Sequence, residues 1–222
     1  MTTPSLTGPG LLPRSGQRPS RLVVMLHGLG ADGGDLIALA PDFAEALPDA
    51  EFLAPNAPFP CDMAPFGRQW FSLQDSSPAA IVRGLEVARP ILDAFLDSEL
   101  ARRGLADRDL ALVGFSQGTM LSLFTALRRP QACAAILGYS GLLAAPDRLP
   151  AELTARPPVL LVHGEQDPVV SYPFMGLAQS ALQLMQVPVA AVTRPELGHS
   201  IDDEGLALGV RFLAEHFVEK QA

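Results

Sequence analysis

The sequence is poor in cysteine, in basic residues relative to acidic ones, and in long apolar runs. Its 222 residues include two cysteines, Cys61 and Cys133, which lie far apart in the chain. They fit neither a disulfide framework nor the spacing of metal ligands, so a reducing compartment is favoured. Cys133 lies in an apolar run and is expected to be a buried thiol, whereas Cys61 lies in a loop and could be exposed.

The charge balance argues against nucleic acid as a partner. The formal net charge is −8 at pH 7, and acidity of this size mostly serves solubility. No apolar run reaches the length that a membrane span needs. The first ten residues lack the basic region and apolar core of a signal peptide. We therefore expect a soluble cytoplasmic protein without stable membrane insertion.

Strand-like apolar runs alternate with helix-like segments along the chain, which predicts a mostly parallel sheet with helices on both faces. No repeat or linker interrupts the pattern, so we expect one domain over residues 1–222, with an irregular lead-in over 1–20. The expected strands span 22–26, 51–54, 110–113, 132–137, 159–162 and 187–193. The expected helices span 35–47, 79–103, 119–129, 172–185 and 202–218. Asp35 should cap the first helix, which restarts near Pro41, and Pro90 should bend or split the second.

The segment Gly114-Phe-Ser-Gln-Gly118 is a G-x-S-x-G motif between an apolar strand and a helix. This context is typical of a nucleophile elbow, a sharp turn that exposes a serine hydroxyl at the carboxyl edge of a sheet. A side chain at Gly114 or Gly118 would collide with neighbouring elements in such a turn. Ser116 is therefore the candidate nucleophile.

Two further reactive side chains follow predicted strands. Asp167 follows strand 159–162, and His199 follows strand 187–193. Ligands of such sheets gather at the carboxyl ends of the strands, and the chain order Ser, Asp, His is that of α/β-hydrolases. Histidine can take the serine proton near neutral pH, and a carboxylate on its other ring nitrogen fixes the tautomer. The pattern predicts a metal-free Ser116–Asp167–His199 triad that needs no cofactor.

Other acidic and histidine side chains are weaker candidates. Asp202 and Asp203 are rivals of Asp167, but they more plausibly cap the last helix. His27 and His163 precede glycines at strand ends and are interpreted as hydrogen-bond partners that organise loops. His216, on the last helix, is interpreted as solvated.

An acyl-transfer reaction also needs two hydrogen-bond donors for the oxyanion of the tetrahedral intermediate. One is the N–H of Gln117, the residue after the nucleophile. The second should come from the glycine-rich loop 27–34, where the N–H of Leu29 is preferred and Gly28 and Gly30 are rivals. The loop 55–78 is long and apolar, so it is interpreted as a pocket wall. The residues expected to bind the acyl chain are Met63, Trp70, Phe71, Leu142, Leu143 and Val169.

Several motifs in one order resemble the phospholipase/carboxylesterase family of small serine hydrolases, which includes the acyl-protein thioesterases. They are Leu26-His-Gly-Leu-Gly, Asn56-Ala-Pro58, Gln69-Trp-Phe71, Gly114-Phe-Ser-Gln-Gly118, Ser140-Gly141, His163-Gly-Glu-Gln-Asp-Pro168 and Gly198-His-Ser-Ile201. The resemblance covers nearly the whole chain from Leu22. It implies an α/β-hydrolase without a large cap domain, the triad named above, and Leu29 with Gln117 as the oxyanion pair. Many relatives have Asp after the Trp-Phe pair, where this sequence has Ser72, a difference that bears on substrate preference.

The expected function is hydrolysis of carboxylic esters, or of thioesters, with short to medium acyl chains. Lysophospholipase or acyl-protein thioesterase activity is an alternative. An acyltransferase or a peptidase would use the same acyl-enzyme. A catalytically silent α/β-hydrolase that serves as a binding module is the alternative outside enzymes. Relatives are often monomers or dimers, and either state is expected here, with a small-molecule substrate as the partner.

Overall fold

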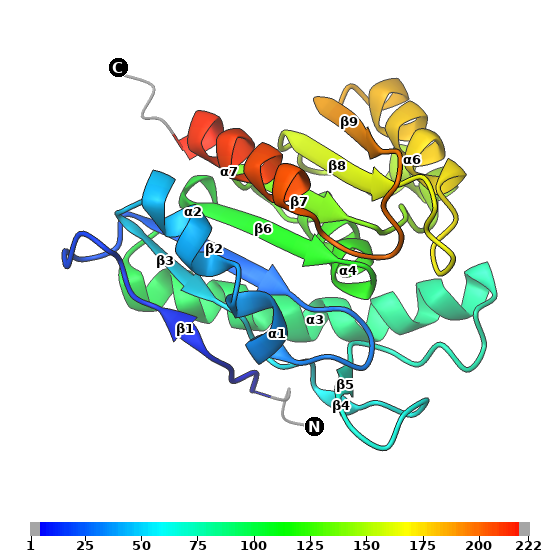
Figure 1. The fold of residues 1–222 in the computed structure, drawn as a ribbon, viewed down its shortest axis with the longest axis horizontal. Coiled ribbons are helices and arrows are strands. Elements are labelled where there is room, and N and C mark those ends of the chain that lie inside the picture. Colours follow the sequence, from blue (N-terminus) through cyan, green and yellow to red (C-terminus); the bar gives the residue numbers. More distant parts are fainter. Residues whose placement is uncertain (1–4, 218–222) are drawn as a thin grey trace.

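A seven-stranded sheet forms the centre of the computed structural model, which describes residues 5–217 (Figure 1). The strand order is β1-β3-β2-β6-β7-β8-β9, with β1 antiparallel to β3 and every other pair parallel. The strands are β1 (Gly10–Leu11), β2 (Arg21–Leu26), β3 (Ala50–Leu53), β6 (Leu110–Phe115), β7 (Ala135–Tyr139), β8 (Val159–Gly164) and β9 (Val189–Arg194). This arrangement confirms the predicted fold class.

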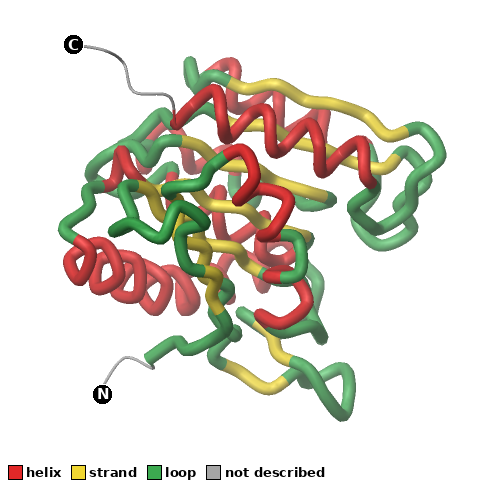
Figure 2. The backbone as a smooth tube through the Cα atoms, turned by 60° about the vertical axis from the view of Figure 1, so that its left-hand side comes forward, coloured by secondary structure: helices red, strands yellow, loops and turns green. Residues whose placement is uncertain are grey.

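Helices cover both faces of the sheet (Figure 2). They are α1 (Gly33–Ile37), α2 (Ala40–Ala46), α3 (Pro78–Arg103), α4 (Gln117–Ala126), α5 (Leu149–Glu152), α6 (Pro173–Leu184) and α7 (Asp203–Phe217), with 3₁₀ turns at Asp107–Asp109 and Pro146–Arg148.

Alternate residues of the central strands enter two separate cores. In β2, Leu22 and Val24 pack on the side of α3, α4 and α6, whereas Val23 and Met25 pack on the side of α1, α2 and α7. A strand buried on both faces needs apolar residues at every position, and this explains why the runs are continuous rather than alternating.

Two details of the helices differ from the prediction, and a third agrees with it. α3 is one unsplit helix, because residues on both sides of Pro90, such as Leu85 and Leu92, are held in the same core while Pro90 itself is exposed. Asp32, rather than Asp35, caps α1 by accepting a hydrogen bond from the N–H of Gly34. α2 begins beside Pro41, as expected.

The loop 55–78 contains a short hairpin of β4 (Phe59–Pro60) and β5 (Arg68–Gln69). Cys61 lies in this segment and is buried, although its place in a loop allowed exposure. Cys133 is a buried free thiol, and burial raises its pKa to about 12. Among residues 5–217, no helix combines the length and apolarity needed to cross a bilayer.

Candidate active site

Ser116 occupies the sharp turn between β6 and α4. Its backbone has φ 53° and ψ −114°, a region that costs a non-glycine residue conformational energy. Surrounding hydrogen bonds hold this conformation: the N–H of Ser116 donates to the carbonyl of Tyr139 at 2.9 Å, and its carbonyl accepts from the N–H of Met120 at 3.1 Å. The turn directs the serine side chain away from the core and into a cavity.

Close backbone contacts around the turn explain the two glycines of the motif. A Cβ atom at Gly118 would collide with the carbonyl oxygen of Leu26 at the end of β2. A Cβ atom at Gly114 would collide with the backbone of Gly118 and Thr119. α4 therefore lies directly against β2, which brings its first residue next to the loop that follows β2.

Asp167 and His199 form a hydrogen-bonded pair beyond the ends of β8 and β9. The Nδ1 of His199 lies 2.7 Å from Oδ2 of Asp167, whose side chain is fully buried. Oδ1 of Asp167 accepts hydrogen bonds from the N–H groups of Val169 and Val170 at 2.8 and 2.9 Å. Burial alone would raise the pKa of Asp167, but these hydrogen bonds outweigh it, so the pKa of the carboxyl lies below its usual value. The pair is thus an ionised carboxylate that orients an imidazole.

His163 lies next to this carboxylate. Its Nε2 lies 2.8 Å from the carbonyl oxygen of Val170 and 3.2 Å from Oδ2 of Asp167. Because a carbonyl only accepts, Nε2 carries the proton and donates. His163 therefore organises the loop that carries Asp167, as predicted.

The rivals of Asp167 have other partners. Oδ1 of Asp202 accepts from the N–H of Gly205 at 2.9 Å, within the first turn of α7, and its carboxylate pairs with Arg194. Asp203 is the first residue of α7. His216 lies on α7 and packs on Phe212.

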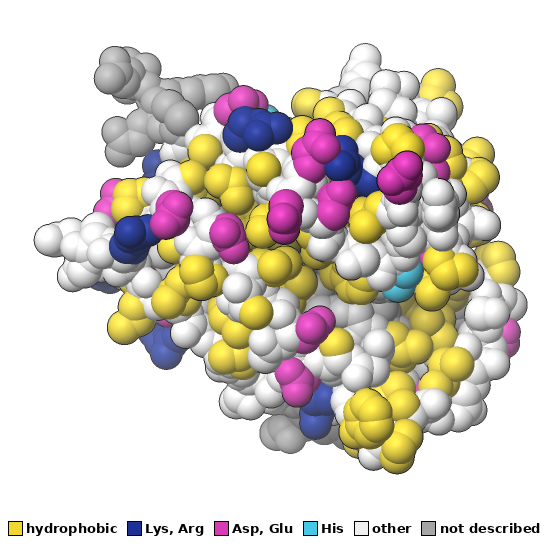
Figure 3. All heavy atoms as spheres, viewed as in Figure 1, with side chains coloured by type: hydrophobic (Ala, Val, Ile, Leu, Met, Phe, Trp, Pro, Cys, Tyr) yellow, Lys and Arg dark blue, Asp and Glu magenta, His cyan; other side chains and the backbone are white. Residues whose placement is uncertain are grey.

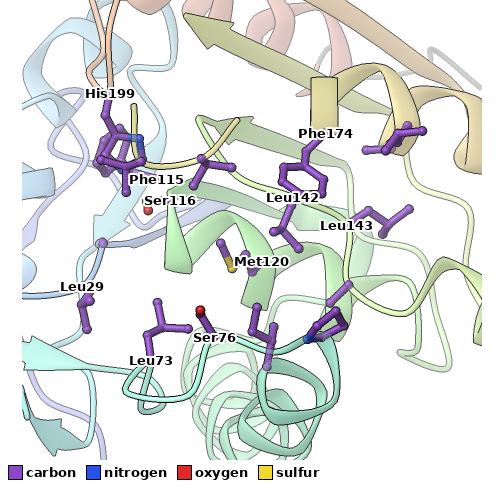
Figure 4. Close-up of a pocket in the computed structure, with 18 of the residues that line it drawn as sticks. Leu29, Leu73, Ser76, Phe115, Ser116, Met120, Leu142, Leu143, Phe174 and His199 are labelled. Atoms are coloured by element: carbon purple, nitrogen blue, oxygen red, sulfur yellow. The ribbon is translucent and has the colours of Figure 1, made fainter. Parts of the chain in front are cut away.

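Ser116 and His199 lie together at one end of a cavity of about 770 Å³ (Figure 4). This volume is within the range of small-molecule sites. The cavity extends from the serine toward Leu143 and Phe174 (Figure 4). Its other apolar walls include Leu73, Ile81, Met120, Leu142, Val169 and Leu177.

The structure brings three of the six predicted acyl-binding residues to this cavity: Leu142, Leu143 and Val169. It places the other three elsewhere. Trp70 is fully buried and donates its indole N–H to the carbonyl of His27 at 2.9 Å, and Phe71 packs in the core against Gly84 of α3. Met63 is 59% exposed in the β4–β5 hairpin, over which hydrophobic side chains gather (Figure 3). Trp70 and Phe71 do not line the cavity because their side chains pack in the buried core.

Several residues that line the cavity were not predicted from the sequence. Met120 lies one helical turn after Ser116, so the elbow position could have identified it. Phe174 and Leu177 are exposed residues of α6, and Leu73 and Ser76 belong to a loop without periodicity. No local pattern distinguishes such residues from ordinary surface positions.

The loop after β2 borders the cavity through Gly28 and Leu29. The N–H of Gly30 is engaged, since it donates to the carbonyl of Arg68 at 2.9 Å. In the described part of the chain, the N–H of Leu29 donates to no protein acceptor. Nε2 of His27 accepts from the N–H of Ala57 at 3.0 Å, and burial lowers the pKa of His27, so this histidine stays neutral and supports the loop. No cluster of three or more potential metal ligands occurs within residues 5–217.

The parallel sheet, the turn at Ser116 and the Asp–His pair at adjacent strand ends define an α/β-hydrolase. A model of the phospholipase/carboxylesterase family matches residues 13–217, and the chain belongs to this family, as the resemblance predicted.

Individual relatives carry different descriptions. The crystal structure of esterase PE8 superposes with a TM-score of 0.92 at 43% identity, covering 96% of this chain and 100% of that one. Acyl-protein thioesterase 1 of Neurospora crassa is 28% identical, over 93% of this chain and 91% of that protein. A probable inactive carboxylesterase of Oryza sativa subsp. japonica is 33% identical, over 66% of this chain and 64% of that protein.

The hydrogen bonds of Asp167 predict a pH-dependent contribution to stability. The pKa of the carboxyl is lower in the folded state than the value of about 3.9 in the unfolded chain, so its contribution is present above that value and is lost as pH falls through the folded pKa. We expect Asp167→Asn to lower the free energy of unfolding by about 1–2 kcal/mol at pH 7. The difference from wild type should shrink toward about pH 3.

Urea unfolding at both pH values measures this difference. Exposed Asp49 is the matched control, and Asp49→Asn should change stability by less than about 0.5 kcal/mol. A difference between wild type and Asp167→Asn that is the same at both pH values would contradict the account.

Proposed function

We propose that this protein is a serine hydrolase that cleaves carboxylic esters through an acyl-enzyme. Ser116 Oγ attacks the acyl carbonyl carbon while His199 takes the hydroxyl proton. Asp167 holds the Nδ1–H of His199 and stabilises the imidazolium. The N–H groups of Leu29 and Gln117 bind the oxyanion. The imidazolium then protonates the departing alcohol. A water molecule, deprotonated by His199, releases the carboxylic acid and restores Ser116.

One observation carries this proposal: a serine in a strained turn and a carboxylate-bound histidine border the same end of one apolar cavity (Figure 4). Backbone strain is common at functional sites, and here the strained residue carries a hydroxyl into the cavity that His199 also borders. Family membership adds support, since this family is one of esterases.

A thioester substrate is the second candidate, because a relative is described as an acyl-protein thioesterase. The acyl-enzyme would be identical, and only the leaving group would differ. A matched panel of oxygen esters and thioesters with one acyl group compares the two activities. Inactivity of wild type on the whole panel would favour a silent binding module instead.

The cytoplasm remains the proposed compartment, which the two free, buried cysteines favour.

The role of Ser116 predicts the effect of removing its hydroxyl. Ser116→Ala should lower kcat by about 10³-fold or more, since loss of a triad nucleophile removes the acyl-enzyme route. The hydroxyl belongs to a site residue and not to the core, so the thermal midpoint should stay within a few degrees of wild type. Hydrolysis of p-nitrophenyl acetate together with a melting curve measures both. Retention of more than about a tenth of wild-type kcat would rule out Ser116 as the nucleophile.

The cavity walls motivate a prediction about chain length. We propose that short to medium acyl chains lie along Leu142, Leu143 and Val169, with Leu143 and Phe174 bounding the far side (Figure 4). Across p-nitrophenyl esters from acetate to palmitate, kcat/KM should reach its maximum at a short or medium chain and then fall. A value of kcat/KM that stays level or rises out to palmitate would refute this preference.

A further inference from the structure

The side chain of Gln117 is fully buried although glutamine is a strongly polar residue. Its Oε1 accepts a hydrogen bond from the N–H of Trp70, and its Nε2 donates to the carbonyl of Phe71, both at 2.8 Å. The amide thus behaves like a short piece of neighbouring β-strand for residues 70–71. Only a group with one donor and one acceptor in this geometry satisfies both backbone partners.

Residues 68–70 in turn fix the loop after β2 through three hydrogen bonds. The N–H of Gly30 donates to the carbonyl of Arg68, and the N–H of Arg68 donates to the carbonyl of Ala31, both at 2.9 Å. The indole N–H of Trp70 donates to the carbonyl of His27. The loop that contains Leu29 is therefore bound on both sides of that residue. A continuous path of hydrogen bonds leads from the side chain of Gln117 to this loop.

The two proposed oxyanion donors belong to separate parts of the chain. The N–H of Gln117 starts α4, whereas the N–H of Leu29 lies in the loop between β2 and α1. An oxyanion hole works only if its donors are held at the right separation before the reaction, and an error of about 1 Å can cost about 100-fold in rate. The packing of Gly118 on Leu26 brings the two segments together, and the hydrogen bonds of residues 68–71 connect the side chain of Gln117 to the loop that carries Leu29.

We propose that the side chain of Gln117 is a positioning residue that sets the distance between the two oxyanion donors. This role is distinct from that of its backbone N–H, and it rests on the proposed function. It predicts that loss of the amide lowers kcat more than it raises KM, because the oxyanion forms only in the transition state.

A second buried glutamine, Gln69 of the β4–β5 hairpin, provides a matched control. Gln69 is 5% exposed, and its Oε1 accepts from the N–H of Asp62 at 3.1 Å. This hydrogen bond is directed toward the end of the hairpin and not toward the loop after β2. Gln69→Met and Gln117→Met therefore remove a buried amide of the same kind, but only the second one interrupts the path to Leu29.

The first experiment compares kcat and KM of the two Met variants on p-nitrophenyl butyrate. We expect Gln117→Met to lower kcat by about 10- to 100-fold with KM within about threefold of wild type. Gln69→Met should keep kcat within about threefold. Affinity for a trifluoromethyl ketone, whose adduct with the serine carries an oxyanion, should fall in parallel with kcat/KM in Gln117→Met.

The second experiment uses Gln117→Glu and works even if Gln117→Met does not fold. A protonated glutamic acid can accept from the N–H of Trp70 and donate to the carbonyl of Phe71, as the amide does. Burial raises the pKa of such a carboxyl, to about 8 or above in documented cases. As pH rises through that value, the donor is lost, so kcat of this variant should fall on the alkaline side where wild type stays level.

Two results would overturn the proposal. One is a Gln117→Met variant whose kcat stays within about threefold of wild type, or a Gln69→Met control whose kcat falls as far as that of Gln117→Met. The other is a Gln117→Glu variant whose alkaline profile follows that of wild type. Either result leaves the proposed function intact, because wild type would still hydrolyse the ester. An inactive wild type would instead refute the proposed function itself.

Discussion

The close contact between the start of α4 and the end of β2 determines the position of the other groups at the site. Gly118 packs on the carbonyl of Leu26, and no other residue fits there. The contact places the first N–H of α4 beside the loop after β2, and Ser116 precedes that helix in a strained conformation. A favourable helix–sheet contact thus offsets a local conformational cost, and the proposed nucleophile and oxyanion donors depend on it.

Around this contact, the parallel sheet supplies the remaining groups. Strands that run in one direction end at one edge, so the loops after β8 and β9 bring Asp167 and His199 to the edge where β6 ends. The carboxylate accepts three hydrogen bonds, from His199 and from two backbone N–H groups, which fixes the orientation of the imidazole. An apolar cavity next to these groups lowers the local dielectric constant and strengthens their electrostatic effect.

The sequence was sufficient for features that depend on position along a strand or helix. The buried strands and the placement of Ser116, Asp167 and His199 after strand ends follow from local patterns. The location of Trp70 and Phe71 could not be predicted from local patterns, because it depends on hydrogen bonds to Gln117, 46 and 47 residues further along the chain. Pro90 was expected to bend or split α3, but long-range packing keeps this helix unsplit. Phe174 and Leu177 look like surface residues of α6 until the fold places them beside the serine.

The central proposal is that two distant side chains, Asp167 and His199, make the hydroxyl of Ser116 reactive toward acyl groups. Its most direct test is labelling with a fluorophosphonate, followed by identification of the modified peptide. We predict one label per chain, on Ser116, and a labelling rate that falls by orders of magnitude in His199→Ala. Absence of label, or a label on another residue while Ser116 stays free, would contradict the account.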